Sequence, residues 1–172
     1  MNIHTSHLTH LDVAQLAASA LFRPQAYFLC AGYGDAERRL VAFDQALLRA
    51  GIADVNLVRL SSIVGPHVKR IEPVKLAPGL LVPTAYAQMC SDVKGERIAA
   101  AVAIAKPDDP ERAGVIMEFS DACSGKEAEE IVRGMAEEAI HNRGLKVAHM
   151  ESIFAEHVVE KTGCVFAGVV QI

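Results

Sequence analysis

The chain has 172 residues, a formal net charge of −4 and a sequence pI of about 6.0. Hydrophobic residues make up 51% of it, aromatic residues make up 5% and tryptophan is absent, which excludes a disordered chain and a base-stacking surface for nucleic acid. No basic face is recognisable and no apolar run approaches the roughly 18 residues of a membrane span, so we expect neither a nucleic-acid partner nor a membrane partner. The length suits a single domain over residues 1–172.

Cysteine usage and the N-terminal composition both indicate a cytoplasmic protein. The cysteines are widely spaced, form no CxxC pair and lie in or near apolar runs, which favours reduced core residues: Cys30, Cys90, Cys123 and Cys164. No stretch rich in Lys or Arg precedes an apolar run at the N-terminus, so we expect no signal peptide.

The first residues carry three histidines, His4, His7 and His10, whose spacing places them on one side of a helix. No acidic or thiol side chain accompanies them, so we interpret this segment as a frayed terminus and expect no metal. Residues 11–22 have helical spacing and form the first predicted helix. Residues 26–31 form the first predicted strand.

A glycine-containing stretch follows this strand. We interpret Gly32 to Asp35 as a flexible turn, because one GxG without a third glycine is a weak indication of a phosphate-binding loop. Residues 36–50 are predicted to form a helix that Gly51 ends. Its expected apolar stripe consists of Leu40, Val41, Phe43, Leu47 and Leu48.

The next segment combines an apolar strand with two hydroxyl side chains. Residues 55–60 are predicted to form a buried strand that runs directly into Ser61 and Ser62. Ile63 follows, and then a break at Gly65-Pro66. Polar residues at the end of a strand are a common place for chemistry, because the strand holds them rigidly.

The rest of the chain is predicted to alternate strands with one long helix. The capping-box pattern of Ser124 and Glu127 begins that helix, which extends to about residue 142, and residues 106–112 form a hydrophilic turn. The predicted strands cover residues 68–74 (an edge strand bounded by prolines), 79–89, 97–105, 114–119, 146–155 and 164–172. Helices and strands in this order predict an α+β layered fold.

The Ser-Ser pair permits the chain to cut itself. The Ser62 hydroxyl can attack the Ser61 carbonyl and convert the amide into an ester, provided that the backbone is strained and donors stabilise the oxyanion. β-Elimination then releases the Ser61 carboxylate, and hydrolysis leaves a pyruvoyl group at position 62 and ammonia. A ketone of this kind is an electron sink for a substrate amine, as pyridoxal phosphate is. The products would be fragments 1–61 and 62–172.

Three further polar residues are candidate partners of this reaction. Asn56, at the start of a β-rich stretch, can orient Ser61 or donate to the oxyanion, or it is a turn residue. Glu118 lies among apolar residues, where burial would raise the pKa of its carboxyl and suit it as a proton donor, unless it faces solvent. Asp44 can receive a cationic substrate, or it is a solvated helix residue.

The chain resembles the pyruvoyl-dependent arginine decarboxylases. The segments that carry the resemblance are AFDQALLRAGIADVNLVRLSSI (42–63), LVPTAYAQMCSDVKGERIAAAVAIAKP (81–107), GVIMEFSDACSGKEAEEIV (114–132) and ESIFAEHVVEKTGC (151–164). The first and third segments are specific, because they contain the Ser-Ser pair and the glutamate.

The resemblance implies a function and a set of site residues. It implies that L-arginine is converted to agmatine and carbon dioxide, with Ser61-Ser62 as the cleaved bond and Ser62 as the pyruvoyl precursor. Asn56 would assist cleavage and contact the ligand, Glu118 would protonate the substrate α-carbon, and Asp44 would pair with the guanidinium. Leu47 and Ile63 would form pocket walls. The implied fold is a four-layer αββα sandwich that forms trimers or pairs of trimers, with sites between neighbouring subunits.

The chain departs from the pattern of this family at two places. Gly65 stands where the family usually has proline, and we expect it to loosen the segment after the cut. Tyr33 lies in a turn that is rich in Gly and Ser in the family, and we expect it to reshape the pocket entrance. Two alternatives stay open: a pyruvoyl enzyme for another amino acid, and an unprocessed trimeric scaffold or regulator.

Overall fold

The computed structural model describes residues 23–172. Within these residues the chain forms a five-stranded sheet (sheet A), a four-stranded sheet (sheet B) and two helices. The fold is therefore α+β, as predicted. The predicted helix at residues 11–22 and the histidines His4, His7 and His10 lie outside the described residues.

Sheet A contains strands from the whole length of the described chain. Its order is β2-β5-β9-β1-β4. β1 pairs antiparallel with β9 from Tyr27 to Ala36, and β9 pairs antiparallel with β5. The strands are β1 (Ala26–Ala36), β2 (Asn56–Arg59), β4 (Lys69–Arg70), β5 (Leu81–Ser91) and β9 (Thr162–Gln171).

Sheet B is antiparallel and has the order β3-β7-β6-β8. Along its inner strand β6, one apolar face carries only alanines (Ala99, Ala101, Ala103 and Ala105), and the other carries Ile98, Ala100, Val102 and Ile104, which is the period of two expected of a strand. Its strands are β3 (Ile63–Val64), β6 (Arg97–Pro107), β7 (Gly114–Asp121) and β8 (Val147–Val158).

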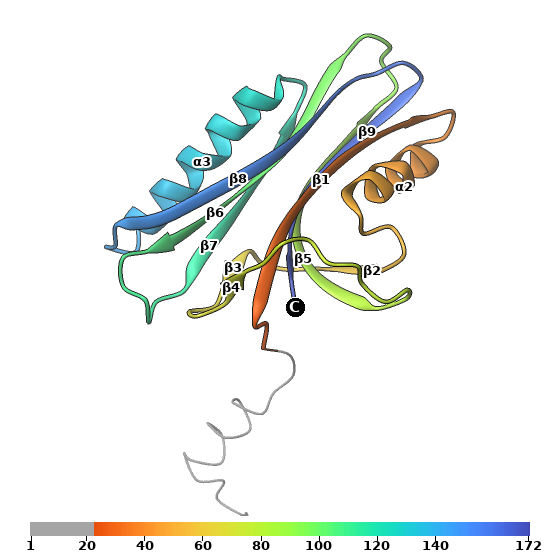
Figure 1. The fold of residues 1–172 in the computed structure, drawn as a ribbon. Helices are drawn as coiled ribbons and strands as arrows, with labels where there is room; N and C mark the ends of the chain where they lie inside the picture. The colour runs from red at the N-terminus through yellow and green to blue at the C-terminus, as the bar shows by residue number, and fades with distance from the viewer. Residues whose placement is uncertain (1–22) are drawn as a thin grey trace, which may run out of the picture.

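The helices and sheets stack in four layers, which is compatible with the expected αββα sandwich (Figure 1). Helix α2 (Arg39–Ala50) packs on the outer face of sheet A, and helix α3 (Gly125–His141) packs on the outer face of sheet B. A third apolar cluster fills the space between the sheets. Ser124 caps α3 with the predicted capping box, and Gly51 ends α2 in a left-handed conformation with φ 77°.

Three details of the sequence interpretation are wrong near the N-terminal end of this fold. Gly32 to Asp35 is not a turn, because β1 continues to Ala36. Helix α2 begins at Arg39 and buries mainly alanines, so that Leu40, Val41 and Leu48 of the expected stripe are exposed. Residues 55–60 are not a buried strand, because β2 is an edge strand of sheet A with mostly exposed side chains.

The two glycines explain why β1 replaces the predicted turn. Gly32 and Gly34 continue the face of β1 that contacts α2. A Cβ at Gly32 would lie 2.7 Å from the backbone nitrogen of Ala50, and a Cβ at Gly34 would lie 2.9 Å from that of Ala46. These glycines therefore allow the helix to approach the strand closely.

The expectation that all four cysteines are reduced is wrong for two of them. Cys90 on β5 and Cys164 on β9 form a disulfide, whereas Cys30 and Cys123 are free. The pair are direct partners in the register of the two antiparallel strands, with Cα atoms 4.0 Å apart. The sequence could not show this proximity, because the register of β5 against β9 brings together residues that are 74 positions apart.

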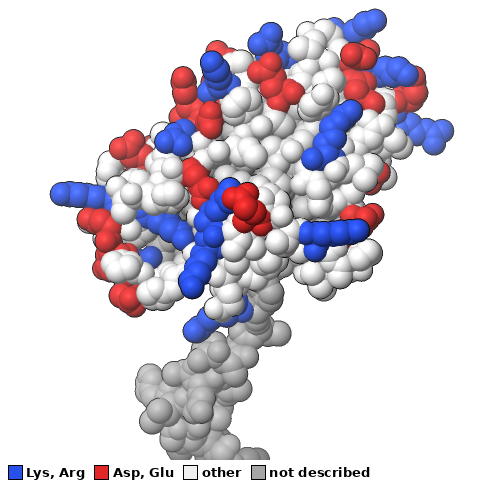
Figure 2. Space-filling model, viewed as in Figure 1, with Lys and Arg blue, Asp and Glu red and all other residues white. Residues whose placement is uncertain are grey.

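Charged side chains of both signs are interspersed over the face shown in Figure 2. In residues 23–172, neither helix is long and apolar enough to cross a membrane. The expected absence of nucleic-acid and membrane partners stays a prediction.

Candidate active site

The Ser61-Ser62 peptide bond lies where the chain crosses from sheet A to sheet B. On the sheet A side, the backbone nitrogen of Leu60 donates to the carbonyl of Thr84 at 3.1 Å. On the sheet B side, the backbone nitrogen of Ile116 donates to the carbonyl of Ser62 at 2.8 Å, and β3 begins at Ile63. The predicted cleavage site is therefore anchored to a different sheet on each side.

Ser62 has an unusual backbone conformation. Its φ is 68°, in the left-handed region, and His67 is the other non-glycine residue with positive φ in residues 23–172. Such a conformation costs a residue with a Cβ roughly 1–3 kcal/mol and persists only where the surroundings hold it in place. The backbone is therefore strained at Ser62, the residue whose hydroxyl is predicted to attack the preceding peptide bond.

The structure brings Ser62 and Glu118 together. The Ser62 hydroxyl donates a hydrogen bond to Oε1 of Glu118, which lies on β7. Glu118 is on the same face of β7 as Ile116, whose side chain belongs to the core between the sheets. The alternative that Glu118 faces bulk solvent is therefore wrong.

Burial changes the acidity of Glu118. Desolvation raises the pKa of this carboxyl, while the hydrogen bond from Ser62 and the positive charge of Arg59 oppose part of that rise. A carboxyl with a raised pKa retains its proton to higher pH, which suits a proton donor.

Arg59 is a neighbour that the sequence analysis missed. Its guanidinium lies 4.6 Å from the ring centroid of Tyr86, and its Nη2 donates to the Tyr86 carbonyl at 3.0 Å. These contacts hold the positive charge of Arg59 near Glu118. The indication that the sequence offered for this residue was its position three residues before Ser62.

Asn56 is the first residue of β2, and its side chain forms a hydrogen bond with a residue other than Ser61. Its Nδ2 donates to the carbonyl of Gly79 at 3.1 Å, and its backbone nitrogen donates to the carbonyl of Leu80 at 2.8 Å. The structure of one chain therefore ties Asn56 to the turn before β5 and does not place its amide on Ser61.

Asp44 and Leu47 lie on α2, apart from Ser62. Leu47 is buried between α2 and sheet A, and Asp44 is exposed. Sheet A separates this helix from Glu118, which faces the space between the sheets. One chain therefore does not bring Asp44 to the Ser62–Glu118 pair, whereas Ile63, which is 44% exposed, directly follows Ser62.

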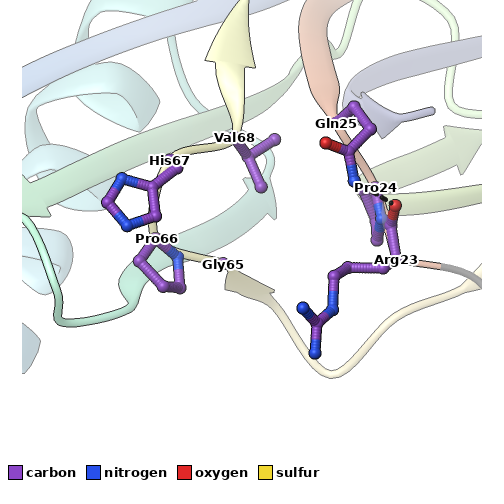
Figure 3. Close-up of a pocket in the computed structure, with 7 residues that line it drawn as sticks. All are labelled: Arg23, Pro24, Gln25, Gly65, Pro66, His67 and Val68. Atoms are coloured by element: carbon purple, nitrogen blue, oxygen red, sulfur yellow. Dashed lines mark hydrogen bonds between the residues drawn. The ribbon is translucent and has the colours of Figure 1, made fainter. Parts of the chain in front are cut away.

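A surface cavity of about 450 Å³ lies beside the segment that follows the Ser-Ser pair (Figure 3). It is lined by residues 23–25 on one side and residues 65–68 on the other, and neither Ser62 nor Glu118 lines it. Gly65 does not have positive φ, and a Cβ there would meet the side chain of Val68 at 3.3 Å. The expected loosening of this segment by Gly65 stays a prediction.

Tyr33 lies in another part of the molecule. Its ring stacks on His157 with centroids 4.9 Å apart, and the Arg49 guanidinium lies 4.4 Å from the ring centroid. Tyr33 and Arg49 line an open cleft together with Glu156, and neither Ser62 nor Glu118 lines it. The expected effect of Tyr33 on the pocket entrance is therefore not seen within one chain.

The family described as pyruvoyl-dependent arginine decarboxylase (PvlArgDC) matches residues 26–170. The chain belongs to this family. The matched residues include the Ser-Ser pair, Glu118 and both described helices.

Several pyruvoyl-dependent arginine decarboxylases are similar to this chain along most of its length. One from Methanocaldococcus jannaschii is 49% identical over 144 residues, which cover 84% of this chain and 87% of that protein. One from Methanococcus maripaludis strain C7 is 46% identical over 144 residues, which cover 84% of this chain and 88% of that protein. One from Thermococcus kodakarensis is 40% identical over 138 residues, which cover 80% of this chain and 87% of that protein.

Proposed function

We propose that this chain is a pyruvoyl-dependent decarboxylase that converts L-arginine to agmatine and carbon dioxide after it cleaves itself between Ser61 and Ser62. Membership of the family supports the reaction and the pyruvoyl group. The observation that carries the proposal for this chain is the contact between the Ser62 hydroxyl and Glu118, at a left-handed serine between two sheets.

Self-cleavage begins with the Ser62 hydroxyl. Its oxygen attacks the Ser61 carbonyl carbon, the carbon–nitrogen bond breaks, and the hydroxyl proton passes to the freed nitrogen. The Cα proton and the Cβ–Oγ bond are then lost, which releases the Ser61 carboxylate and leaves dehydroalanine. Water hydrolyses this residue to a pyruvoyl group and ammonia. Glu118 orients the hydroxyl, and the positive φ of Ser62 favours relief of the strained peptide.

The residues around position 62 suit the pyruvoyl group. When formed, it supplies an electron sink for the amine of the substrate. Glu118 lies beside it, and burial raises the pKa of this carboxyl, so that a proton is available for the substrate α-carbon after carbon dioxide leaves. The Ser62 carbonyl stays fixed by the backbone nitrogen of Ile116 at 2.8 Å.

We infer that Asp44 reaches the site from a neighbouring subunit and binds the guanidinium of arginine. Asp44 is exposed on α2, and the same helix exposes Leu40, Val41 and Leu48. Leu40 is 78% exposed, and exposed apolar groups of this kind are typical of a surface that another subunit covers. A trimer, or a pair of trimers, would join this surface to Ser62 and Glu118 of the next chain, with Asn56, Leu47 and Ile63 near the ligand.

The two fragments should remain one domain after cleavage. β1 of fragment 1–61 pairs with β9 of fragment 62–172 from Tyr27 to Ala36, and β2 pairs with β5 from Asn56 to Arg59. Hydrogen bonds between strands therefore hold the fragments together.

We retain the cytoplasm as the proposed location.

Release of labelled carbon dioxide from carboxyl-labelled arginine tests this proposal. The purified protein, Ser62→Ala and Ser120→Ala should be compared, because Ser120 lies on β7 near Glu118 and its hydroxyl bonds to the Gln88 carbonyl at 3.1 Å. We expect turnover of arginine, but not of lysine or ornithine, by the wild type and Ser120→Ala, and none by Ser62→Ala. Activity of Ser62→Ala, or turnover of lysine in place of arginine, would contradict the proposal.

A further inference from the structure

Gln171 is a buried polar residue of sheet A whose side chain extends to sheet B. It is the last residue of β9 and is 2% exposed. Its backbone pairs with Tyr27 of β1 in sheet A, whereas its Nε2 donates to the carbonyl of Ile63 in sheet B at 2.9 Å. In Figure 1 the C-terminal end of β9 lies at the same end of the molecule as β3. Gln171 therefore connects the two sheets at the residue next to Ser62.

Ile63 needs such a partner because β3 is the edge strand of sheet B. Ser62 accepts a backbone hydrogen bond from Ile116 of β7, and successive residues of a strand direct their backbone groups to opposite sides. The Ile63 carbonyl therefore points away from β7 and has no neighbouring strand to bond with. Gln171 supplies the donor that a further strand would otherwise provide.

The two hydrogen bonds hold the peptide groups on either side of Ile63, the residue that follows Ser62. Ile116 holds the carbonyl of Ser62, and Gln171 holds the next carbonyl from the other side. With both carbonyls held, the backbone of Ile63 is fixed, so the carbonyl end of Ser62 stays in place and keeps the residue beside Glu118. This matters because the left-handed φ of 68° is a conformation that serine leaves readily when nothing opposes it.

Cleavage increases the importance of this contact. Before cleavage, Ser61 links Ser62 covalently to Leu60 and so to sheet A; afterwards, residue 62 is a chain terminus. β3 contains two residues, so few strand hydrogen bonds keep the new terminus in place. The Gln171–Ile63 bond then remains as a connection from sheet A to the residue beside the pyruvoyl group.

We propose that Gln171 is a positioning residue that holds position 62 against Glu118, both for self-cleavage and for the decarboxylation that follows. This inference rests on the proposed function, because it concerns the same site. The residue acts through the Ile63 carbonyl and does not contact the reacting atoms.

Thr84 provides a matched control. Gln171 and Thr84 are the buried polar residues of the described core, and both lie in sheet A. The Thr84 hydroxyl bonds to the carbonyl of Val82 on its own strand at 3.1 Å, so its side chain does not reach sheet B. Gln171→Leu and Thr84→Val therefore each remove one buried polar group, but only the first removes the link to Ile63.

The rate of self-cleavage is measured by mass spectrometry after synthesis of each full chain. We expect Gln171→Leu to cleave about fivefold more slowly or worse, as the loss of one buried hydrogen bond implies, and Thr84→Val to cleave within twofold of the wild-type rate. The cleaved Gln171→Leu protein should have a lower kcat for arginine with an unchanged KM. Wild-type cleavage and kcat in Gln171→Leu, or equal slowing in Thr84→Val, would overturn the proposal.

A second measurement does not depend on cleavage. In a Ser62→Ala background, amide hydrogen exchange of Ile116 reports whether the carbonyl of residue 62 is held. We expect Gln171→Leu to accelerate exchange of this amide at least fivefold and Thr84→Val to leave it unchanged. Unchanged exchange in Gln171→Leu would refute the positioning role, whereas an uncleaved wild-type chain would refute the proposed function alone.

Discussion

The hydroxyl of Ser62 donates a hydrogen bond to the carboxyl group of Glu118, which lies 56 residues later in the chain. The two side chains come from a crossing segment between the sheets and from the inward face of β7. This pair therefore combines a nucleophile beside a strained peptide with an acid whose pKa is raised by burial. The same carboxyl can orient the hydroxyl before cleavage and supply a proton afterwards.

Glu118→Gln should separate these two steps. The glutamine amide oxygen can still accept the hydrogen bond from Ser62, so the chain should be cleaved. The amide cannot protonate the substrate α-carbon, so kcat for arginine should fall about 100-fold or more, as the loss of a general acid implies. Cleavage is followed on a denaturing gel and kcat by product formation. Undiminished kcat would remove Glu118 from the role of proton donor.

The pH dependence of kcat should respond to Arg59. Only the protonated form of Glu118 donates a proton, so kcat should fall as pH rises through the pKa of this carboxyl. The Arg59 charge lowers that pKa, so Arg59→Met should raise it and move the fall in kcat to higher pH. The profile is measured on cleaved protein.

Arg49→Met is the control for that measurement. The Arg49 guanidinium also lies over a tyrosine ring, that of Tyr33, and donates to its backbone carbonyl, but it is not among the charges that affect Glu118. Its profile should keep the wild-type position on the pH axis. A shift to lower pH in Arg59→Met would show that the assigned electrostatic effect has the wrong sign.

Asp44→Ala should chiefly weaken the binding of arginine. Loss of a charge-assisted hydrogen bond to the guanidinium should raise KM about tenfold or more, with a smaller effect on kcat. Glu137→Ala is a suitable control, because Glu137 is also an exposed acidic helix residue but lies on α3. Steady-state kinetics with arginine measure both variants. An unchanged KM in Asp44→Ala would mean that another residue holds the guanidinium.

Gly34→Ala should destabilise the contact between β1 and α2. The added Cβ would overlap the carbonyl oxygen of Ala42 and lie 2.9 Å from the backbone nitrogen of Ala46. Such overpacking should lower the free energy of unfolding by about 2 kcal/mol. Gly134→Ala on α3 should be neutral or stabilising by less than about 1 kcal/mol, because a Cβ there meets nothing within 4 Å. Denaturant unfolding that finds the two variants equally stable would contradict this account of the glycine.

Local patterns in the sequence predicted much of this fold. The Ser124 and Glu127 capping box, the end of α2 at Gly51 and most of the later strands follow from patterns within a few residues, and the structure confirms them. The Gly32 to Asp35 segment could not be assigned in this way. Its glycines are required by α2 packing on β1, which is a contact between elements rather than a turn propensity.

The candidate site was likewise predicted only in part from the sequence. The Ser-Ser pair and Glu118 could be singled out from residue type and resemblance, but their contact depends on how β3 and β7 pair. Arg59 and Gln171 were missed, because a charge near a carboxyl and an amide that reaches across two sheets have no local signature. The disulfide between Cys90 and Cys164 was missed for the same reason.

The intact mass of freshly purified protein, measured without reductant, tests the central claim most directly. Cys90 and Cys164 both follow Ser62, so their disulfide does not join the fragments. We expect two masses, one for residues 1–61 and one for residues 62–172 that is lighter by one ammonia than a fragment beginning with serine. A single mass equal to that of the uncleaved chain, unchanged on ageing, would contradict the account.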